Sequence, residues 1–255
     1  MSHVGIAVLK SSFAIIKDYF SWILPNAHNP RKMPMSIKFM KLKNLILKVN
    51  KNLKLDFHVF GIENTQIDGF GCFTPNHQGA YDPVAVACTL KKPTTFISKD
   101  DNKKLPFIGK IIYAMEGIFL NRKDLRDSLL VMQKMENDLA EQNKNWIIFP
   151  EGTRVNDVRD DLLEFHKGAY KAAMKAKAPI IPTALYGTHL ALSNKVKLRK
   201  YPIYVSYLKP LYVDDYKDMT VEEVTALCRS AIQEEVNRLR KLFDKEVETL
   251  KIVKG

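Results

Sequence analysis

Disulfide bonds and cysteine-based metal sites are the first features that the sequence excludes. Only three cysteines, Cys72, Cys88 and Cys228, occur among 255 residues, far apart and without a CxxC pair. This spacing excludes a disulfide scaffold or a zinc finger and suits a reducing compartment. No apolar run reaches the roughly 18 residues of a spanning helix, and the N-terminus lacks the charged start and cleavage site of a secretory signal. We therefore expect a protein on the soluble side, with any membrane contact made at its surface.

Acidic residues are scarce, and in one stretch they are missing altogether. Forty Lys and Arg face 28 Asp and Glu, for a net charge of +12, while an apolar fraction of 46% fits a globular chain. Between Tyr19 and Leu55 there is no acid, and the eight cationic side chains are Arg31, Lys32, Lys38, Lys41, Lys43, Lys48, Lys51 and Lys54. Such a surplus predicts an anionic partner, which could be nucleic acid, a lipid headgroup surface or an acidic carrier.

The first 54 residues are predicted to form two amphipathic helices, over about 4–24 and 35–49. Apolar residues recur at helical spacing in both, and Pro25, Pro30 and Pro34 are expected to break the chain between them. A basic amphipathic pair of this kind is suited to the interface of an anionic bilayer. The alternative is a pair packed on the rest of the protein with a solvated basic face, and this segment alone does not decide between the two. A nucleic-acid arm fits less well because the aliphatic content is high.

From residue 55 onward the pattern alternates between short strands and helices. Strands are predicted over 55–61, 69–74, 94–98, 117–120, 146–149, 179–185 and 201–213. Helices are predicted over 83–90, 105–115, 125–142, 167–177 and 221–250. This alternation predicts an α/β fold with a mixed, mainly parallel sheet flanked by helices. We expect a two-helix motif over residues 1–54 and one α/β domain over residues 55–255.

A histidine and an acid follow the second predicted strand. His77 stands at the end of an apolar run, and Asp82 comes five residues later, directly before Pro83. A histidine whose ring is held by a carboxylate can take a proton from a hydroxyl. Asp82 could equally be the N-cap of the next helix, with Pro83 at its first position. One carboxylate could serve both roles, with one oxygen accepting from the imidazole and the other from the helix amides.

Cationic and polar groups follow three further strands. Arg122 and the run Glu151-Gly152-Thr153-Arg154 follow apolar strands, and Lys99 follows the strand predicted over 94–98. Since groups that follow neighbouring parallel strands gather at one edge of a sheet, these would converge. Arginines beside the Gly152-Thr153 backbone and hydroxyl would hold a phosphate. Each is ordinary when taken singly, but together with His77 they describe a phosphate site beside a general base. No cluster has metal-ligand spacing, so no metal and no cofactor are expected.

Four blocks in this region resemble the glycerolipid acyltransferase family. NHQGAYD at 76–82 is similar to its NHx4D signature, and GIFLNR at 117–122 to its second block. FPEGTR at 149–154 matches its third block, and IIPTALYG at 180–187 resembles its fourth, all in the family's order. In length and layout the chain looks most like the bacterial 1-acylglycerol-3-phosphate branch, in which a two-helix N-terminal motif seats the enzyme on the membrane.

The resemblance implies a role for each matching residue. His77 would be the general base and Asp82 its partner, while Arg122 and residues Glu151, Gly152, Thr153 and Arg154 would hold the acceptor phosphate. Lys99 resembles a family lysine placed near that phosphate. The sequence departs from the family pattern at four positions, where Gly79 replaces a common Ser, Asn121 an Asp, Val155 a Ser and His166 a Lys. These departures leave the base and phosphate ligands in place but put the acceptor and acyl specificity in doubt.

The function implied by the resemblance is acyl transfer from a thioester to the sn-2 hydroxyl of 1-acylglycerol-3-phosphate, giving phosphatidic acid. The expected partners are acyl-CoA or acyl carrier protein as donor, lysophosphatidic acid as acceptor and an anionic membrane surface, with no nucleic acid. The expected location is the cytoplasmic face of a membrane, as a peripheral or monotopic protein. The alternatives are an acyltransferase acting on glycerol-3-phosphate or another lysophospholipid, and a non-enzymatic basic protein that binds membranes or nucleic acid.

Overall fold

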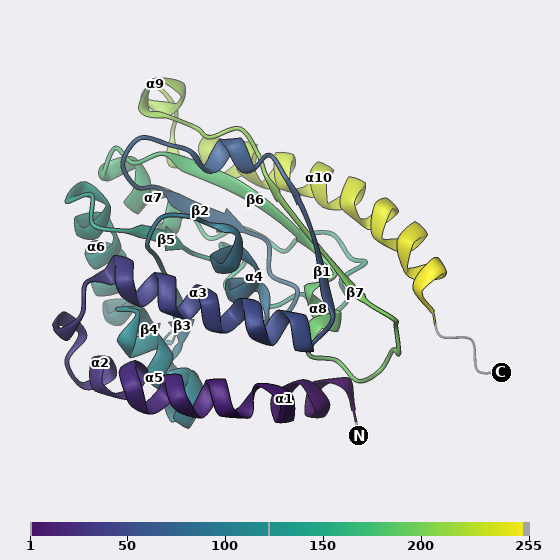
Figure 1. Cartoon of the computed structure of the whole chain (residues 1–255). Coiled ribbons are helices and arrows are strands. Elements are labelled where there is room, and N and C mark those ends of the chain that lie inside the picture. Colours follow the sequence, from purple (N-terminus) through teal and green to yellow (C-terminus); the bar gives the residue numbers. More distant parts are fainter. Residues whose placement is uncertain (1, 122, 252–255) are drawn as a thin grey trace.

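A seven-stranded sheet forms the centre of the computed structural model, which describes residues 2–121 and 123–251 (Figure 1). In space the strands follow the order β1-β7-β6-β2-β5-β3-β4. Neighbouring strands run parallel except β6 and β7, which are antiparallel. The prediction of a mixed, mainly parallel sheet is confirmed. Its strands are β1 Leu55–Phe60, β2 Cys72–Pro75, β3 Thr94–Lys99, β4 Ile118–Leu120, β5 Asn145–Ile147, β6 Ile180–Tyr186 and β7 Tyr201–Tyr207.

Helices cover both faces of the sheet, because successive strand residues point to opposite sides. Phe73, Ile147 and Ile181 pack in the cluster that includes the N-terminal helices and α4, whereas Cys72 and Trp146 pack in the cluster with α6, α7 and α10. Burial on both faces explains why these strands are continuously apolar in sequence. The helices are α1 His3–Asp18, α2 Leu24–His28, α3 Met35–Asn52, α4 Asp82–Thr89, α5 Pro106–Ala114, α6 Leu125–Ala140, α7 Gly168–Lys175, α8 Thr188–Ala191, α9 Val213–Tyr216 and α10 Val221–Leu250.

Most predicted elements occur within a few residues of their expected bounds. The clearest error is the strand predicted over 201–213, because β7 ends at Tyr207 and the chain then turns into α9. Pro25 was also expected to end the first helix, but a π-helical turn over Tyr19–Ile23 leads directly into α2. The N–H of Leu24 donates to the carbonyl of Tyr19 in this turn, and Pro25 then stands in the first turn of α2, where a missing N–H costs little.

The N-terminal helices pack on the sheet domain and still leave an apolar outer surface. On α3, Phe39, Leu42 and Ile46 are buried as the spacing predicted. Facing outward is an apolar surface made of Leu9, Phe13, Ile16 and Phe20 with Ile37, Met40 and Leu47, each between 40% and 79% exposed. We call this set the outer apolar face. Among the described residues, no helix is both long enough and apolar enough to cross a membrane.

Two of the eight cations expected on the surface of this segment bind groups elsewhere in the protein. Lys38 is fully buried, where its ammonium pairs with Glu116 at 2.5 Å and donates to the Pro30 carbonyl at 2.9 Å. Lys43 donates to the Leu90 carbonyl at 2.7 Å. A buried ammonium must be paired, and these contacts join α3 to the sheet domain. Residues of α1 to α3 also share one hydrophobic cluster with the sheet, so a boundary at residue 54 stays a prediction.

Candidate active site

The carboxyl ends of four parallel strands meet at one edge of the sheet. Strands β2, β5, β3 and β4 are consecutive neighbours, as the pairings of β2 with β5, β5 with β3 and β3 with β4 show. His77 follows β2, Glu151 to Arg154 follow β5, and Lys99 ends β3. Arg122, predicted after β4, lies outside the described residues. The predicted groups that the structure describes therefore share one edge, which is where open α/β sheets place their ligands.

His77 and Asp82 form a close pair at this edge. The Nδ1 of His77 lies 2.6 Å from Oδ2 of Asp82, and the Asp82 side chain is completely buried. A buried carboxylate that accepts from Nδ1 fixes the imidazole tautomer that leaves Nε2 unprotonated. The ring is also stacked against Phe149, with centroids 4.3 Å apart. The His77 side chain remains 15% exposed, and among the described residues the hydrogen bond of its ring is made by Nδ1, which leaves Nε2 to act as the base.

The prediction that Asp82 also caps helix α4 is wrong. Asp82 is the first residue of α4, and Tyr81 occupies the N-cap position. The amides that donate to Asp82 belong to the preceding loop, Gln78 at 2.6 Å and Gly79 at 2.9 Å, and both reach the same Oδ2 that binds His77. The other oxygen, Oδ1, is buried without a partner among the described residues. The turn 77–82 thus closes on one carboxylate oxygen, which holds the loop and the imidazole together.

Glu151 binds the backbone of His77 rather than its ring. One carboxylate oxygen accepts the backbone N–H of His77 at 2.6 Å, and the other accepts the N–H of Leu163 at 3.0 Å. Glu151 is 2% exposed, and burial is the largest influence on its carboxyl group and raises its pKa. The two backbone N–H groups favour the charged form in opposition. Both oxygens of this acid are therefore occupied by the protein.

Two hydrogen bonds to the His77 backbone, one from a side chain and one from a backbone N–H, hold the loop after β5 against this residue. Glu151 accepts the N–H of His77, and the N–H of Val155 donates to the carbonyl of His77 at 3.1 Å. The two contacts lie on either side of residues 152–154, so this three-residue stretch adjoins the histidine. Thr153 and Arg154 are exposed on it. The structure thus places the backbone of residues 152–154 beside His77, and the convergence of the Arg154 guanidinium on this histidine stays a prediction.

The backbone conformation of Gly152 accounts for a glycine at this position. Its φ is +66°, and a Cβ there would lie 2.9 Å from Cδ2 of His166, so the site requires glycine. Its N–H already donates to the Phe149 carbonyl at 3.0 Å. The glycine therefore makes the turn that presents Thr153 and Arg154.

Lys99 lies further from the histidine than the other described groups. Strand β3 is separated from β2 by β5, and two interstrand spacings amount to roughly 10 Å. The Lys99 side chain is 60% exposed and pairs with Asp101. It shares the edge but has its own counterion.

Two residues that support the site were not assigned a role from sequence. Asn76 is 1% exposed and bridges to β6, where Leu185 donates to its Oδ1 at 2.7 Å and its amide donates back at 3.2 Å. Phe149 stacks on His77. Asn76 lies within the NHQGAYD block, which could have pointed to it, but nothing in the local sequence indicates the partner Leu185 or the stacking of Phe149.

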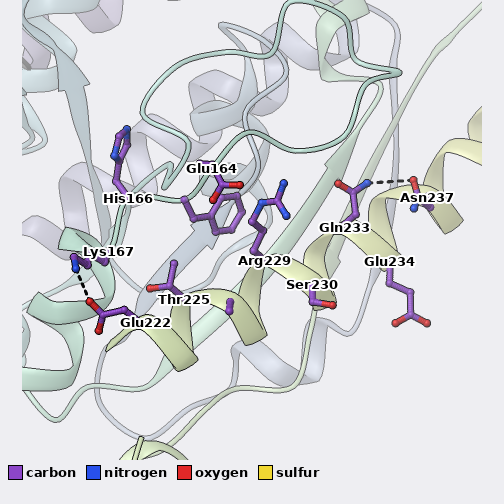
Figure 2. Close-up of a pocket in the computed structure, with 12 residues that line it drawn as sticks. Glu164, His166, Lys167, Glu222, Thr225, Arg229, Ser230, Gln233, Glu234 and Asn237 are labelled. Atoms are coloured by element: carbon purple, nitrogen blue, oxygen red, sulfur yellow. Dashed lines mark hydrogen bonds and ion pairs between the residues drawn. The ribbon is translucent and has the colours of Figure 1, made fainter. Parts of the chain in front are cut away.

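The loop carrying Leu163 is fastened to helix α10. Leu162 donates to Gln233 at 2.7 Å, and the guanidinium of Arg229 donates to the Leu163 carbonyl at 3.0 Å. Beside these contacts lies a groove of about 780 Å³, between α10 and residues 164–167 (Figure 2). The lining includes none of the predicted site residues. The groove is therefore a neighbour of the site, and the fastened loop supplies the amide that binds Glu151.

A second histidine lies near the pair. His189, on the short helix α8, has a pKa lowered to about 4, chiefly because burial disfavours its charged form, while the charge of Asp82 acts in the opposite direction. A Cβ at Gly79 would lie 3.2 Å from the Cα of His189, so the start of α8 packs directly against the 77–82 turn. No room is left at Gly79 for the serine side chain that the family pattern has there without a small shift of α8.

Comparison with known sequences identifies relatives for this arrangement. A protein-family model described as Acyltransferase matches residues 56–186, about half of the chain. The chain is 30% identical over 182 residues to the 1-acyl-sn-glycerol-3-phosphate acyltransferase of Salmonella typhimurium, covering 70% of each protein. The Escherichia coli (strain K12) enzyme of the same name gives the same identity and coverage. That of Cocos nucifera is 31% identical over 56% of this chain and 46% of its own.

A solved structure has the same fold. The 1-acyl-sn-glycerophosphate (LPA) acyltransferase PlsC from Thermotoga maritima superposes with a TM-score of 0.71 at 22% identity, covering 92% of this chain and 95% of that one. At this identity the likeness is one of fold. The matched region of the family model contains His77, Asp82 and the loop after β5, and on these grounds the chain belongs to the acyltransferase family.

Proposed function

We propose that the protein transfers an acyl group from a thioester to the hydroxyl of a phosphorylated glycerolipid, 1-acylglycerol-3-phosphate, giving phosphatidic acid. The observation that carries the proposal is the pair of hydrogen bonds to the His77 backbone, from the Glu151 carboxylate and the Val155 N–H, that holds residues 152–154 against His77. A phosphate bound at Arg154 would then have its glycerol hydroxyl within reach of the imidazole. The names of the relatives support this choice of acceptor.

In the proposed reaction His77 acts as general base. Its Nε2 takes the proton of the acceptor hydroxyl as the oxygen attacks the thioester carbonyl. A new C–O bond forms, the C–S bond breaks, and the proton passes from the imidazolium to the leaving thiolate. Asp82 stabilises the imidazolium, as the acid does in a Ser-His-Asp triad, but here the substrate oxygen takes the place of the serine. The cysteines Cys72, Cys88 and Cys228 are buried, and the proposal uses no protein nucleophile.

Arg154 and Thr153 are the proposed phosphate ligands. Arginine matches phosphate oxygens with two parallel donors, and both side chains are exposed on the stretch whose flanking residues contact the His77 backbone. Arg122 is included on the family resemblance alone, and Lys99 is proposed as a more distant contribution to the positive field.

For Glu151 the geometry points to a role other than the phosphate ligand that the resemblance implied. A buried carboxylate carries the wrong charge for that task, and its two oxygens already bind His77 and Leu163. We propose instead that it positions the backbone of His77. Gly152 likewise contributes the shape of the turn.

The outer apolar face is proposed to rest on an anionic membrane, as a peripheral or monotopic contact. Seven large apolar side chains are exposed on α1, the π-helical turn and α3, and large apolar patches on the surface of soluble proteins mark sites of interaction with membranes or other proteins. Exposed lysines on the same segment, among them Lys17 and Lys48, suit lipid headgroups. Replacing Phe13 and Phe20 by serine should weaken sedimentation with phosphatidylglycerol vesicles, and unchanged binding would exclude this surface.

A substrate panel tests the proposed reaction. Purified protein is offered 1-acylglycerol-3-phosphate, glycerol-3-phosphate or a phosphate-free lysolipid, each with acyl-CoA and with acyl-loaded carrier protein. Turnover should be fastest with 1-acylglycerol-3-phosphate and fall when the phosphate is missing. Faster turnover of glycerol-3-phosphate would favour the first alternative acceptor. Equal turnover of the phosphate-free lipid would contradict the phosphate site, and absence of turnover with every pair would leave the non-enzymatic reading.

A further inference from the structure

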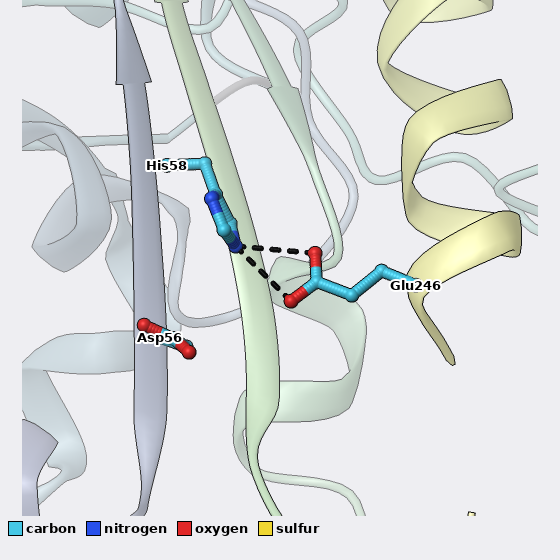
Figure 3. A group of neighbouring side chains, drawn as sticks. All are labelled: Asp56, His58 and Glu246. Atoms are coloured by element: carbon cyan, nitrogen blue, oxygen red, sulfur yellow. Dashed lines mark hydrogen bonds and ion pairs between the residues drawn. The ribbon is translucent and has the colours of Figure 1, made fainter. Parts of the chain in front are cut away.

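Three side chains with metal-binding groups meet at the opposite margin of the sheet, on strand β1 and helix α10. They are Asp56, His58 and Glu246 (Figure 3). One ligand atom from each lies within 4.8 Å of the other two. Strand β1 is the edge strand, separated from β2 by β7 and β6. The cluster is therefore distinct from the His77 site.

Secondary structure places these groups together. Asp56 and His58 are two residues apart on one strand and so point to the same face. Tyr204 is the register partner of His58 on β7, and the two rings are stacked with centroids 4.6 Å apart. The stack fixes the plane of the imidazole, whose Nε2 lies 3.1 Å and 3.2 Å from the two oxygens of Glu246. The Tyr204 hydroxyl donates to the same carboxylate, which orients it as the outer groups of metal sites do.

The spacing suits zinc. Zinc takes imidazole nitrogen and carboxylate oxygen at ~2.0–2.2 Å in tetrahedral geometry, which sets two of its ligands about 3.3 Å apart. The His58 nitrogen and the nearer Glu246 oxygen lie 3.1 Å apart. An Asp56 oxygen would supply a third ligand, and water the fourth, after a small closure from the present distances.

The charge balance also favours a cation. Asp56 and Glu246 are two carboxylates, and among the described residues the lysine paired at this cluster is Lys200, 3.0 Å from Asp56. With a neutral imidazole the set carries a net charge of −1. The Lys200 side chain is 62% exposed, so it can move into solvent when an ion takes its place. Two ion pairs, Lys200 with Asp56 and a protonated His58 with Glu246, would balance the same charges, so binding of an ion requires the neutral imidazole.

We propose that Asp56, His58 and Glu246 bind a divalent cation of the zinc class. The ion would connect β1 to the last turns of α10, across 188 residues of sequence, and would stabilise the fold without taking part in acyl transfer. Spacing along the chain could not reveal the site, because Glu246 is so distant from the other two ligands.

Zinc titration of the chelator-treated full chain tests the proposal. Calorimetry should show one Zn²⁺ bound per chain, and Zn²⁺ should raise the thermal midpoint. His58→Gln and Glu246→Gln should each weaken zinc binding by about tenfold or more while leaving acyl transfer unchanged. Glu246→Gln is the second variant because its side chain keeps the shape of the original, and circular dichroism checks that each variant is folded.

His77→Ala is the matched control, since His77 and Asp82 form the other described histidine–carboxylate pair with a close contact. This variant should bind zinc as the unaltered protein does. Binding that is lost in His77→Ala but kept in His58→Gln would place the ion at the catalytic pair and overturn the proposal. Unchanged affinity in both glutamine variants, or no stoichiometric binding to the unaltered chain, would also overturn it.

Discussion

His77 and Arg154 share one edge of the sheet, yet the protein holds them in different ways. The His77 imidazole has a buried acid on Nδ1 and an aromatic ring against its face, and its backbone N–H and carbonyl are both hydrogen-bonded to the next loop. Arg154 is exposed. The position of the His77 imidazole is therefore fixed in the folded protein, whereas the exposed Arg154 side chain can adjust its position to a ligand.

Because they are held differently, His77 and Arg154 should control different kinetic constants. A base fixed by buried contacts acts in the transition state, so its loss should lower kcat. An exposed cation that holds a phosphate acts on bound substrate and transition state alike, so its loss should raise KM.

Removing the imidazole should cause the largest loss. His77→Ala is expected to lower kcat by ~10²–10⁴-fold, the usual contribution of general base catalysis. The measurement is steady-state transfer from acyl-CoA to 1-acylglycerol-3-phosphate. His58→Gln, on the far edge strand, is the matched histidine control and should retain full turnover. Near-normal kcat in His77→Ala would remove His77 from the mechanism.

The buried histidine next to the pair should make stability depend on pH. Because the pKa of His189 is about 4 in the folded protein and ~6.5 when unfolded, the unfolded state binds the proton first as pH falls. The contribution of His189 to the free energy of unfolding is therefore fully present above pH ~6.5. It falls by about 2–3 kcal/mol as the pH decreases to about 4. Urea unfolding at pH 7 and pH 4.5 should show a smaller loss in His189→Gln than in the unaltered protein.

The comparison with His189→Gln separates the pH-dependent contribution of His189 from the contributions of other titratable groups. Glu151 acts in the opposite sense, because its raised pKa makes its ionisation cost stability as pH rises. Both proteins contain Glu151, so its effect cancels between them. An equal loss of stability in the two proteins would mean that His189 is not the buried, neutral group described.

The guanidinium should affect substrate binding. Arg154→Ala is expected to raise the KM for 1-acylglycerol-3-phosphate by roughly ten- to a hundredfold, the scale of a hydrogen bond to a charged group, with little change in kcat. Lys99→Ala is the matched cation at the same edge. It should change KM by less than about fivefold, because Lys99 is exposed and already paired with Asp101, and exposed charges interact only weakly through water. An unchanged KM in Arg154→Ala would place the phosphate elsewhere.

The sequence predicted the fold well wherever local pattern determines it. Helix α10 spans the predicted residues 221–250, and Thr220 and Glu223 close a capping box at its start. The strand ends that carry His77 and the loop after β5 were also correctly predicted, because apolar runs followed by polar residues mark such ends. Pro25 was misjudged because a π-helical turn, which has no sequence signal of its own, precedes it.

Contacts between distant segments were beyond that reasoning. Glu151 and His77 are separated by 74 residues, and nothing local to either indicates that one accepts from the backbone of the other. Likewise Lys38 belongs to a basic segment by sequence, but in the structure it is buried and paired with Glu116, which is distant in the sequence. In both cases the burial and the partner, rather than the neighbouring residues in sequence, decide what the side chain does.

Glu151 is the residue that most directly separates the His77 base from the proposed phosphate site at Arg154. By sequence it belongs to the loop with Arg154, and by contact it belongs with His77. The decisive measurement is an acceptor titration of Glu151→Gln, whose amide would turn a donor toward one of the two backbone N–H groups. We expect a lower kcat, equivalent to a rise of about 1–3 kcal/mol in the activation free energy. The KM for 1-acylglycerol-3-phosphate should be unchanged. A raised KM with normal kcat would contradict this expectation and return Glu151 to the phosphate site.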